Sequence, residues 1–234
     1  LRFLGTPGQG DGCLREYIVM PQECCLPTGG KITLEQGALC EPLSIGIYAV
    51  HRAQMQENAR IVILGSGPIG LSCMIAAKVR RAEAIYMTDK ILERVKVARK
   101  AGADWVGNPE EEDIVKPILE REPLGVDVVY ECAGEQDTLD EGIELLRPGG
   151  KLVLIGAPRF ERVSFVIDKL RRKEIDIVNI RRQVGCAQPA IDLVASNKAE
   201  VDFLVTHRFG FEQTREAFEM VAGYRDGVVK ALIE

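Results

Sequence analysis

A glycine-rich turn between an apolar run and a helical pattern constrains the fold of this chain more than any other feature. The run Arg60–Leu64 leads into Gly65-Ser-Gly-Pro-Ile-Gly70, and a second apolar run, Ala84–Thr88, ends at Asp89. In such an arrangement the first glycine permits a tight turn, the second leaves the backbone open to a pyrophosphate, and the third lets the helix pack closely on the strand. The free N–H groups and the positive dipole at the helix start attract phosphates. The segment therefore predicts a βαβ unit that binds a dinucleotide.

The residues of this unit predict which dinucleotide is bound. Gly65, Gly67, Pro68 and Gly70 shape the turn, and Asp89 can accept hydrogen bonds from the adenosine ribose hydroxyls. A carboxylate at this position repels a 2′-phosphate, which favours NAD over NADP. Two alternatives stay open: a strand–turn–helix without a ligand, and the glycine-rich turn of an S-adenosylmethionine-dependent methyltransferase. The complete three-glycine spacing argues against the second.

Short apolar, β-branched runs alternate with helical patterns from about residue 59 to residue 180. This alternation predicts an α/β fold, a Rossmann-type doubly wound parallel sheet covered on both faces. Ligands bind such sheets at the carboxyl ends of the strands. The expected strands are Arg60–Leu64, Ala84–Thr88, Val126–Glu131, Lys151–Ile155 and Ile175–Ile180, and the expected helices are Pro68–Arg80, Ile91–Ala101, Glu111–Glu120, Gln136–Leu146 and Val166–Arg172.

The two ends of the chain have a different pattern. Residues 1–40 are rich in Gly, Pro and Cys, which suits an irregular β segment. After a helix at Pro189–Ser196, the tail predicts a strand at Val201–Phe209, a helix at Glu212–Ala222 and a strand at Val228–Ile233. We interpret the ends as two pieces of one β-rich domain that the nucleotide domain interrupts. Such a domain needs more strands than these, so we expect the chain to be part of a longer protein.

Composition narrows the classes of partner. With 234 residues, 46% hydrophobic and 28% charged, the chain resembles soluble globular proteins. A net charge of −5 gives no reason to expect nucleic acid or an anionic membrane as partner. The 7 cysteines are scattered, which favours reduced thiols and a cytoplasmic location. Neither His51 nor His207 has a second histidine or a carboxylate at ligand spacing, so no local motif forms a zinc site. We expect a small-molecule partner.

Further motifs stand in a fixed order along the chain. They are Glu41-Pro-Leu-Ser-Ile-Gly46, Ala101-Gly-Ala-Asp104, Glu131-Cys-Ala-Gly134, Gly149-Gly-Lys-Leu-Val-Leu-Ile-Gly156 and Leu204-Val-Thr-His-Arg-Phe209. Together with the glycine turn, their order and spacing resemble the zinc-dependent medium-chain alcohol dehydrogenases, in particular the sorbitol (polyol) dehydrogenase branch. The resemblance covers essentially the whole chain. The glycine motif is shared widely, but the first and last of these pieces are much more specific.

This resemblance implies an organisation and an activity. Residues 1–41 would end an N-terminal GroES-like catalytic domain, 42–181 would form the NAD-binding Rossmann domain, and 182–234 would return to the catalytic domain. The implied reaction is the NAD- and zinc-dependent oxidation of a secondary alcohol of a polyol or related metabolite to a ketone. A homo-oligomer, dimer or tetramer, would pair through the Ile175–Ile180 edge. A threonine or butanediol dehydrogenase of the same superfamily and a non-catalytic NAD-binding fragment remain alternatives.

The resemblance also assigns site residues. Ile69 would pack near the cofactor, Asp89 would bind the adenosine ribose, and Arg94 would lie beside the adenosine end. The rest of the groove would be lined by Cys132 and, at the nicotinamide half, by Ile155, Gly156, Ala157, Asn179, Ile180 and Arg181.

Two positions concern catalysis. In relatives, a glutamate at the position of Glu41 faces the catalytic zinc as a ligand or near-ligand. The alternative is a helix-start carboxylate, because Pro42 suits a first helical position. Arg181 and Arg182 would orient substrate or cofactor, where the polyol branch has an arginine followed by a tyrosine, a difference that argues against sorbitol itself. The family's other zinc ligands match segments upstream of Leu1, so the chain as given is expected to hold NAD and not a three-ligand zinc.

Overall fold

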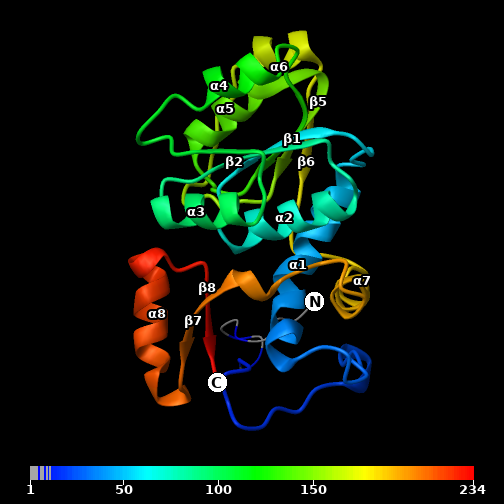
Figure 1. Ribbon diagram of the computed structural model, residues 1–234, viewed down its shortest axis with the longest axis vertical. Helices are drawn as coiled ribbons and strands as arrows, with labels where there is room; N and C mark the ends of the chain where they lie inside the picture. Colours follow the sequence, from blue (N-terminus) through cyan, green and yellow to red (C-terminus); the bar gives the residue numbers. More distant parts are fainter. Residues whose placement is uncertain (1–4, 6–7, 9, 11) are drawn as a thin grey trace.

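A six-stranded parallel sheet forms the upper half of the molecule in Figure 1. The computed structural model describes residues 5, 8, 10 and 12–234. The strand order is β3-β2-β1-β4-β5-β6, and all neighbouring strands are parallel. This order reverses between β1 and β4, which is where open α/β sheets bind their ligands. The strands are β1 (Arg60–Leu64), β2 (Ala84–Thr88), β3 (Trp105–Gly107), β4 (Val126–Glu131), β5 (Leu146–Leu154) and β6 (Asp176–Asn179).

Helices cover both faces of this sheet. Successive residues of β1 point to opposite faces, so Ile61 and Ile63 join one apolar core and Val62 and Leu64 join the other. All four are fully buried, which explains why β1 is a continuous apolar run. The first core includes residues of α1 (Leu34–Arg52), α2 (Pro68–Val79) and α3 (Leu92–Lys100), and the second includes residues of α5 (Gln136–Leu145), α6 (Ile167–Lys173) and α4 (Val115–Arg121).

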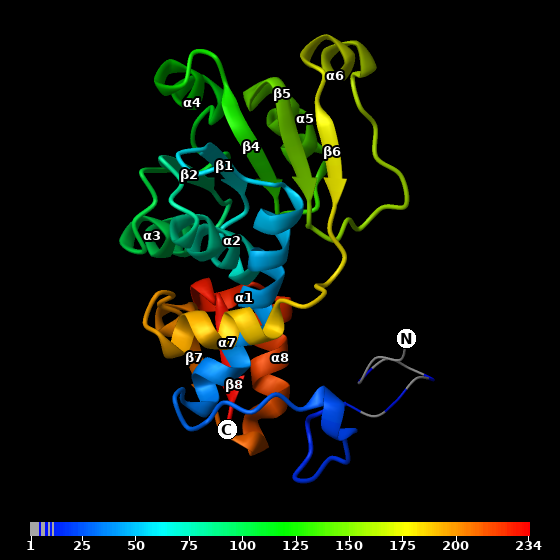
Figure 2. The same ribbon diagram turned by 90° about the vertical axis from the view of Figure 1, so that its right-hand side faces the viewer.

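The remaining elements lie below the sheet, around the N-terminal half of α1 (Figures 1 and 2). They are α7 (Ala187–Ala195), β7 (Val205–Phe209), α8 (Thr214–Ala222) and β8 (Lys230–Ile233), and β7 pairs with β8 in parallel. Arg208 of β7 donates two hydrogen bonds to the carboxylate of Glu35 in α1, at 3.0 and 2.8 Å. The start of α1 and the C-terminal segment therefore meet in one lower layer.

The structure confirms the predicted α/β class and its parallel sheet, with differences in individual elements. β3 has three residues, too few to show an apolar period, and it was not expected. The strand expected at Val201–Phe209 begins only at Val205, because Asp202–Leu204 forms a 3₁₀ turn. Within residues 12–33, the part of the expected N-terminal β segment that can be followed without gaps, there is a 3₁₀ turn at Gln22–Cys24 and no strand. Residues 1–4, 6, 7, 9 and 11 of that expected segment lie outside the described residues.

Helix α1 changes the interpretation of Glu41. The helix begins one residue after Thr33, whose hydroxyl accepts a hydrogen bond from the Gln36 N–H while the Gln36 side chain accepts one from the Thr33 N–H, both at 3.1 Å. This capping box satisfies free backbone donors at the helix start. Glu41 therefore lies about two turns into the helix, and Pro42 is inside it. The interpretation of Glu41 as a helix-start carboxylate is wrong.

Strand β6 is the edge of the sheet, and Ile177 on it is 37% exposed. Coverage of this edge by a second copy stays a prediction. Of the expected domain boundaries, residues 41 and 42 fall inside α1, and residues 181 and 182 fall in the loop after β6. In the part of the chain that is described, no helix is long and apolar enough to cross a membrane.

Candidate dinucleotide-binding site

The turn from β1 into α2 is tightly packed around its glycines. Gly65 has a φ of 104°, which L-residues with a side chain rarely adopt. A Cβ on Gly70 would lie 1.8 Å from the carbonyl oxygen of Gly65, so the third position has no space for one. Gly67 is the N-cap of α2 and Pro68 its first residue. Neither Gly67 nor Pro68 has a side chain that caps the N–H groups at the start of the helix. These N–H groups can therefore bind an anion.

The carboxylate of Asp89 is held beside this turn. One oxygen accepts the Ser66 N–H and the other accepts the Ile91 N–H, both at 2.8 Å. Burial raises the pKa of Asp89, and these two N–H groups together with nearby Arg94 act in the opposite direction. Each carboxylate oxygen can accept a further hydrogen bond. The adenosine ribose can therefore bind Asp89 without breaking the contacts that position it.

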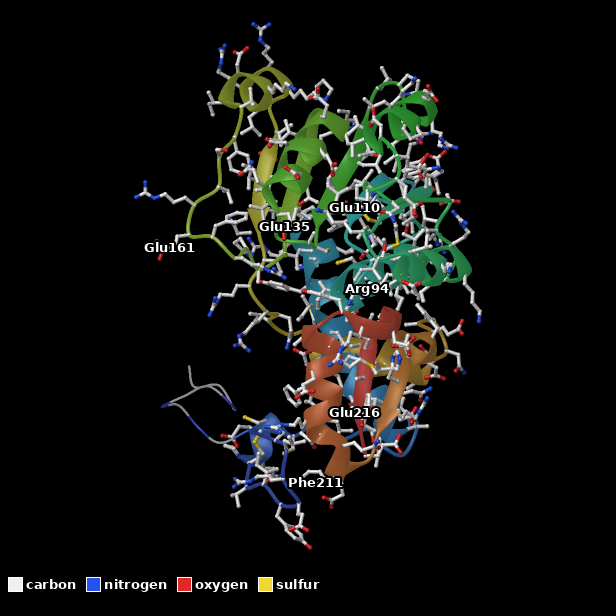
Figure 3. The ribbon with its side chains drawn as sticks, turned by 90° about the vertical axis from the view of Figure 1, so that its left-hand side faces the viewer. Arg94, Glu110, Glu135, Glu161, Phe211 and Glu216 are labelled. Atoms are coloured by element: carbon white, nitrogen blue, oxygen red, sulfur yellow. The ribbon has the colours of Figure 1, made fainter. Side chains whose placement is uncertain are left out.

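Arg94 connects the glycine turn to the end of the chain. Its Nε and Nη2 donate to the carbonyl oxygen of Val228 at 3.1 and 2.7 Å, and its guanidinium lies over the Tyr224 ring, 5.2 Å from the centroid. A Cβ on Gly67 would lie 3.5 Å from Arg94 Nη1. Figure 3 shows Arg94 at the junction between the nucleotide domain and the red C-terminal segment. The guanidinium of Arg94 thus lies next to Gly67, the second glycine of the motif.

Glu131 organises the loops that follow β4 and β5. It is 2% exposed, and its Oε1 accepts hydrogen bonds from the N–H groups of Ala133 (2.8 Å) and Gly134 (2.7 Å) and from the Thr138 hydroxyl (2.9 Å). A Cβ on Gly156 would lie 2.3 Å from the Gly134 nitrogen and 2.7 Å from Glu131 Oε2, so the two loops touch through their backbones. Sequence reasoning did not assign Glu131 to the site. Its signal was a carboxylate that directly ends a buried apolar strand.

Cys132 lies at the switch point between β1 and β4. Its N–H donates to the Leu64 carbonyl at 2.8 Å. A hydrogen bond between its thiol and that of Cys73 in α2, together with burial, holds the pKa of Cys132 well above its usual range. A protonated thiol is a poor nucleophile. Contact of Cys132 with a cofactor stays a prediction.

The other predicted cofactor residues also follow strand ends. Ile155, Gly156 and Ala157 come after β5, and Asn179 ends β6. The Ile180 N–H donates to the Leu154 carbonyl at 2.9 Å. The carboxyl ends of β1, β4, β5 and β6 lie at one end of the parallel sheet, so the fold brings these segments together at the end where such sheets bind ligands. Contact with a cofactor stays a prediction for each of them.

The residues predicted for catalysis are less constrained. Arg181 and Arg182 are exposed, and Arg182 has a φ of 59°. Glu41 is exposed on α1, where its carbonyl oxygen accepts a hydrogen bond from the Ser44 hydroxyl at 2.6 Å. Among the residues that the structure describes, no three His, Cys, Asp or Glu side chains gather to hold a metal ion. The roles predicted for Glu41, Arg181 and Arg182 stay predictions.

Comparison with known proteins identifies the family. The family model described as zinc-binding dehydrogenase matches residues 68–196, more than half of the chain. The chain belongs to the zinc-binding dehydrogenase family. It is 33% identical to the sorbitol dehydrogenase of Bacillus subtilis over 234 residues, which is 100% of this chain and 66% of that protein.

Solved structures of dehydrogenases have the same fold as this chain. L-Idonate 5-dehydrogenase of Escherichia coli matches with a TM-score of 0.88 and 25% identity, over 98% of this chain and 66% of that chain. A protein of Sinorhizobium meliloti, described as a zinc-binding dehydrogenase and bound to NADP, matches with a TM-score of 0.86 and 26% identity, over 96% of this chain and 66% of that one. The chain thus spans slightly less than two thirds of the length of these relatives.

Proposed function

We propose that this chain binds NAD, and that the protein oxidises a secondary alcohol of a polyol or related small metabolite to a ketone. The observation that carries the proposal is Asp89, held by two backbone N–H groups beside an open glycine turn at the switch point of the sheet. Membership of a dehydrogenase family supports the reaction class. The relatives named for sorbitol and L-idonate, both polyhydroxylated, support the substrate class.

The chain's own residues position the cofactor in this proposal. Asp89 binds the adenosine ribose, and the N–H groups at the start of α2 bind the pyrophosphate. The loops at Gly134 and Gly156 border the nicotinamide half. When bound, NAD supplies the hydride acceptor, and the contribution of the protein is to align donor and acceptor.

Zinc is implied by the family, but the donors in the described part of this chain do not fit it on their own. Zinc requires three protein ligands in a catalytic site and four in a structural one. Glu41 supplies one carboxylate, and no cluster of three ligands forms among the residues described. We propose that Glu41 lies beside the metal in the whole protein.

The discrimination between NAD and NADP tests the cofactor site. Titration calorimetry of this chain should show NAD binding, NADP binding at least about tenfold more weakly, and no binding of S-adenosylmethionine. Asp89→Asn removes the charge of the side chain but retains its size. It should lower the affinity for NAD about tenfold or more, and it should bring the affinities for NAD and NADP closer together. Asp168→Asn, on the exposed surface of α6, is the matched control.

Two results would overturn the proposal. One is the absence of NAD binding by the chain, and the other is an NAD/NADP ratio that Asp89→Asn leaves unchanged. For the whole protein supplied with zinc, NADH formation with at least one member of a panel of polyols, sugars and hydroxy amino acids is expected. A panel without any activity would contradict the proposed reaction.

A further inference from the structure

The segment Tyr224–Val228, between α8 and β8, has an unusual backbone. Tyr224, Asp226 and Gly227 have φ values of 49°, 52° and 63°, all in the left-handed region. For a residue with a side chain this conformation is unfavourable, and it persists where surrounding contacts hold it. The contacts of this segment therefore show which parts of the molecule hold it in this conformation.

Some of these contacts are with α3, the helix that follows Asp89 in the candidate site. The Val228 carbonyl accepts both hydrogen bonds from Arg94, and the Tyr224 ring lies beneath the same guanidinium. A Cβ on Gly227 would lie 2.3 Å from the Glu93 Cβ, so the segment packs directly on the first turn of α3. Arg94 is thereby held in front of Gly67, the glycine whose backbone a pyrophosphate approaches.

Another contact of this segment is with the loop after β5. Nη2 of Arg159 donates to the Tyr224 hydroxyl at 3.4 Å. Arg159 lies in the loop after β5, two residues beyond Ala157. One phenol side chain thus contacts two guanidinium groups, one from α3 and one from the β5–α6 loop.

In the described part of the chain these two arginines form no salt bridge, and their hydrogen bonds go to a carbonyl and a hydroxyl. The carboxylate of Asp89 is close enough to Arg94 for the two charges to attract each other. A dinucleotide pyrophosphate carries two negative charges, and guanidinium groups bind phosphate oxygens in strong, charge-assisted pairs. The charge and its position both suit that group.

We propose that Tyr224 is a positioning residue of the dinucleotide site: it holds Arg94 and Arg159 on one phenol side chain, beside the glycine turn, so that both face the pyrophosphate. The inference rests on the proposed NAD binding and adds two functions to it. It assigns Arg159 to the site as a pyrophosphate-binding residue. It also assigns to the C-terminal segment a part in cofactor affinity.

Binding of NAD, ADP and adenosine to the full chain separates the phosphate contribution from the rest. Tyr224→Phe retains the ring under Arg94 and loses the hydroxyl contact, so NAD and ADP affinity should fall about threefold to tenfold. Tyr224→Leu loses both contacts, and a larger fall, about tenfold to thirtyfold, is expected. Arg159→Gln should weaken NAD and ADP at least as much as Tyr224→Phe. Adenosine affinity should not change in Tyr224→Phe or Arg159→Gln, because both keep the ring beneath Arg94.

The chain offers a matched control for removal of a tyrosine beneath an arginine. Arg52 lies over the Tyr48 ring at 5.7 Å and donates to the Tyr48 hydroxyl at 3.2 Å, on α1 and outside the loops that form the site. Tyr48→Phe should leave all three affinities unchanged. Thermal melts measured by circular dichroism identify any variant that is not folded. If Tyr224→Leu does not fold, Arg159→Gln, on an exposed loop, still tests the inference.

The outcomes are distinguishable. If the unmodified chain does not bind NAD, the proposed function fails and this inference fails with it. If the unmodified chain binds NAD, and Tyr224→Phe and Arg159→Gln bind ADP as tightly as it does, only this inference is overturned. A fall in adenosine affinity equal to the fall in ADP affinity would indicate a general disturbance of the groove and would also overturn it.

Discussion

The carboxyl group of Glu141, on α5, has surroundings that disfavour its charge. Burial is the first cause and the charge of Asp137 the second, with Asp113 and Asp140 adding to them, while Lys90 acts in the opposite direction. Together they raise the pKa of Glu141 from 4.5 to about 7. A carboxyl group of this kind is an indicator of a functional site only when it lies in a cleft with a partner. Here the effect belongs to stability.

Replacement of Glu141 by glutamine should stabilise the protein at alkaline pH. Because the folded-state pKa is raised, the native protein binds the extra proton, and the stability this proton provides is full below about pH 4.5 and lost as the pH rises through 7. At pH 8, Glu141→Gln should be more stable than the unmodified chain by about 1–2 kcal/mol, a value reduced for partial exposure. Urea unfolding at pH 5 and pH 8 measures this.

The control for this prediction is Glu144→Gln, one turn further along α5. Glu144 pairs with Lys169 at 3.0 Å on the surface, so its loss should not stabilise the protein at pH 8. A difference between Glu141→Gln and the unmodified chain that is the same at both pH values would contradict the prediction.

At the scale of elements, the contact between α1 and α2 depends on one glycine. A Cβ on Gly46 would lie 2.4 Å from the Ser72 carbonyl oxygen, so the two backbones approach more closely than a side chain permits. On the same helix, a Cβ on Gly37 would meet nothing within 4 Å. One helix therefore contains a glycine required by packing and another that only weakens the helix.

These two glycines predict opposite effects of the same substitution. Gly46→Ala should destabilise the chain by about 1–3 kcal/mol, because the added methyl forces the helices apart. Gly37→Ala should stabilise it by about 0.5–1 kcal/mol, because alanine costs less backbone entropy in a helix. Urea unfolding of both variants measures the difference, and a shift of the two in the same direction would show that the α1–α2 contact is not as close as described.

The elements also show how far local patterns suffice. β1 and β2 were predicted to the residue, because strands buried on both faces are continuous apolar runs. α1 was not, because Pro42 suggested a start where the helix is already formed. Its Thr33-x-x-Gln36 capping signal was present in the sequence. Leu39 and Leu43 of α1 are buried in the core that α1 shares with α2. This packing is a tertiary contact, which a local sequence pattern does not predict.

At the scale of the whole molecule, cofactor binding by this chain should not depend on metal. The proposed dinucleotide site consists of backbone N–H groups, Asp89 and arginines, and the described residues contain no cluster of three metal-ligating side chains. Dialysis against EDTA should leave both the thermal midpoint and the NAD affinity unchanged, as measured by a melt and by titration calorimetry. Bound zinc measured before dialysis, with a fall of the midpoint by several degrees after it, would contradict this.

The sequence by itself determined the βαβ unit, its glycine turn and the position of Asp89. These features depend on residues close along the chain, so spacing and apolar period were sufficient to predict them. Only the tertiary structure brought Arg94 to Val228, 134 residues away, and Arg159 to Tyr224, 65 residues away. It also placed Glu131 between the loops after β4 and β5. The physical reason is that these contacts arise from the packing of separate elements, and a pattern read along one segment does not encode which other segment will lie against it.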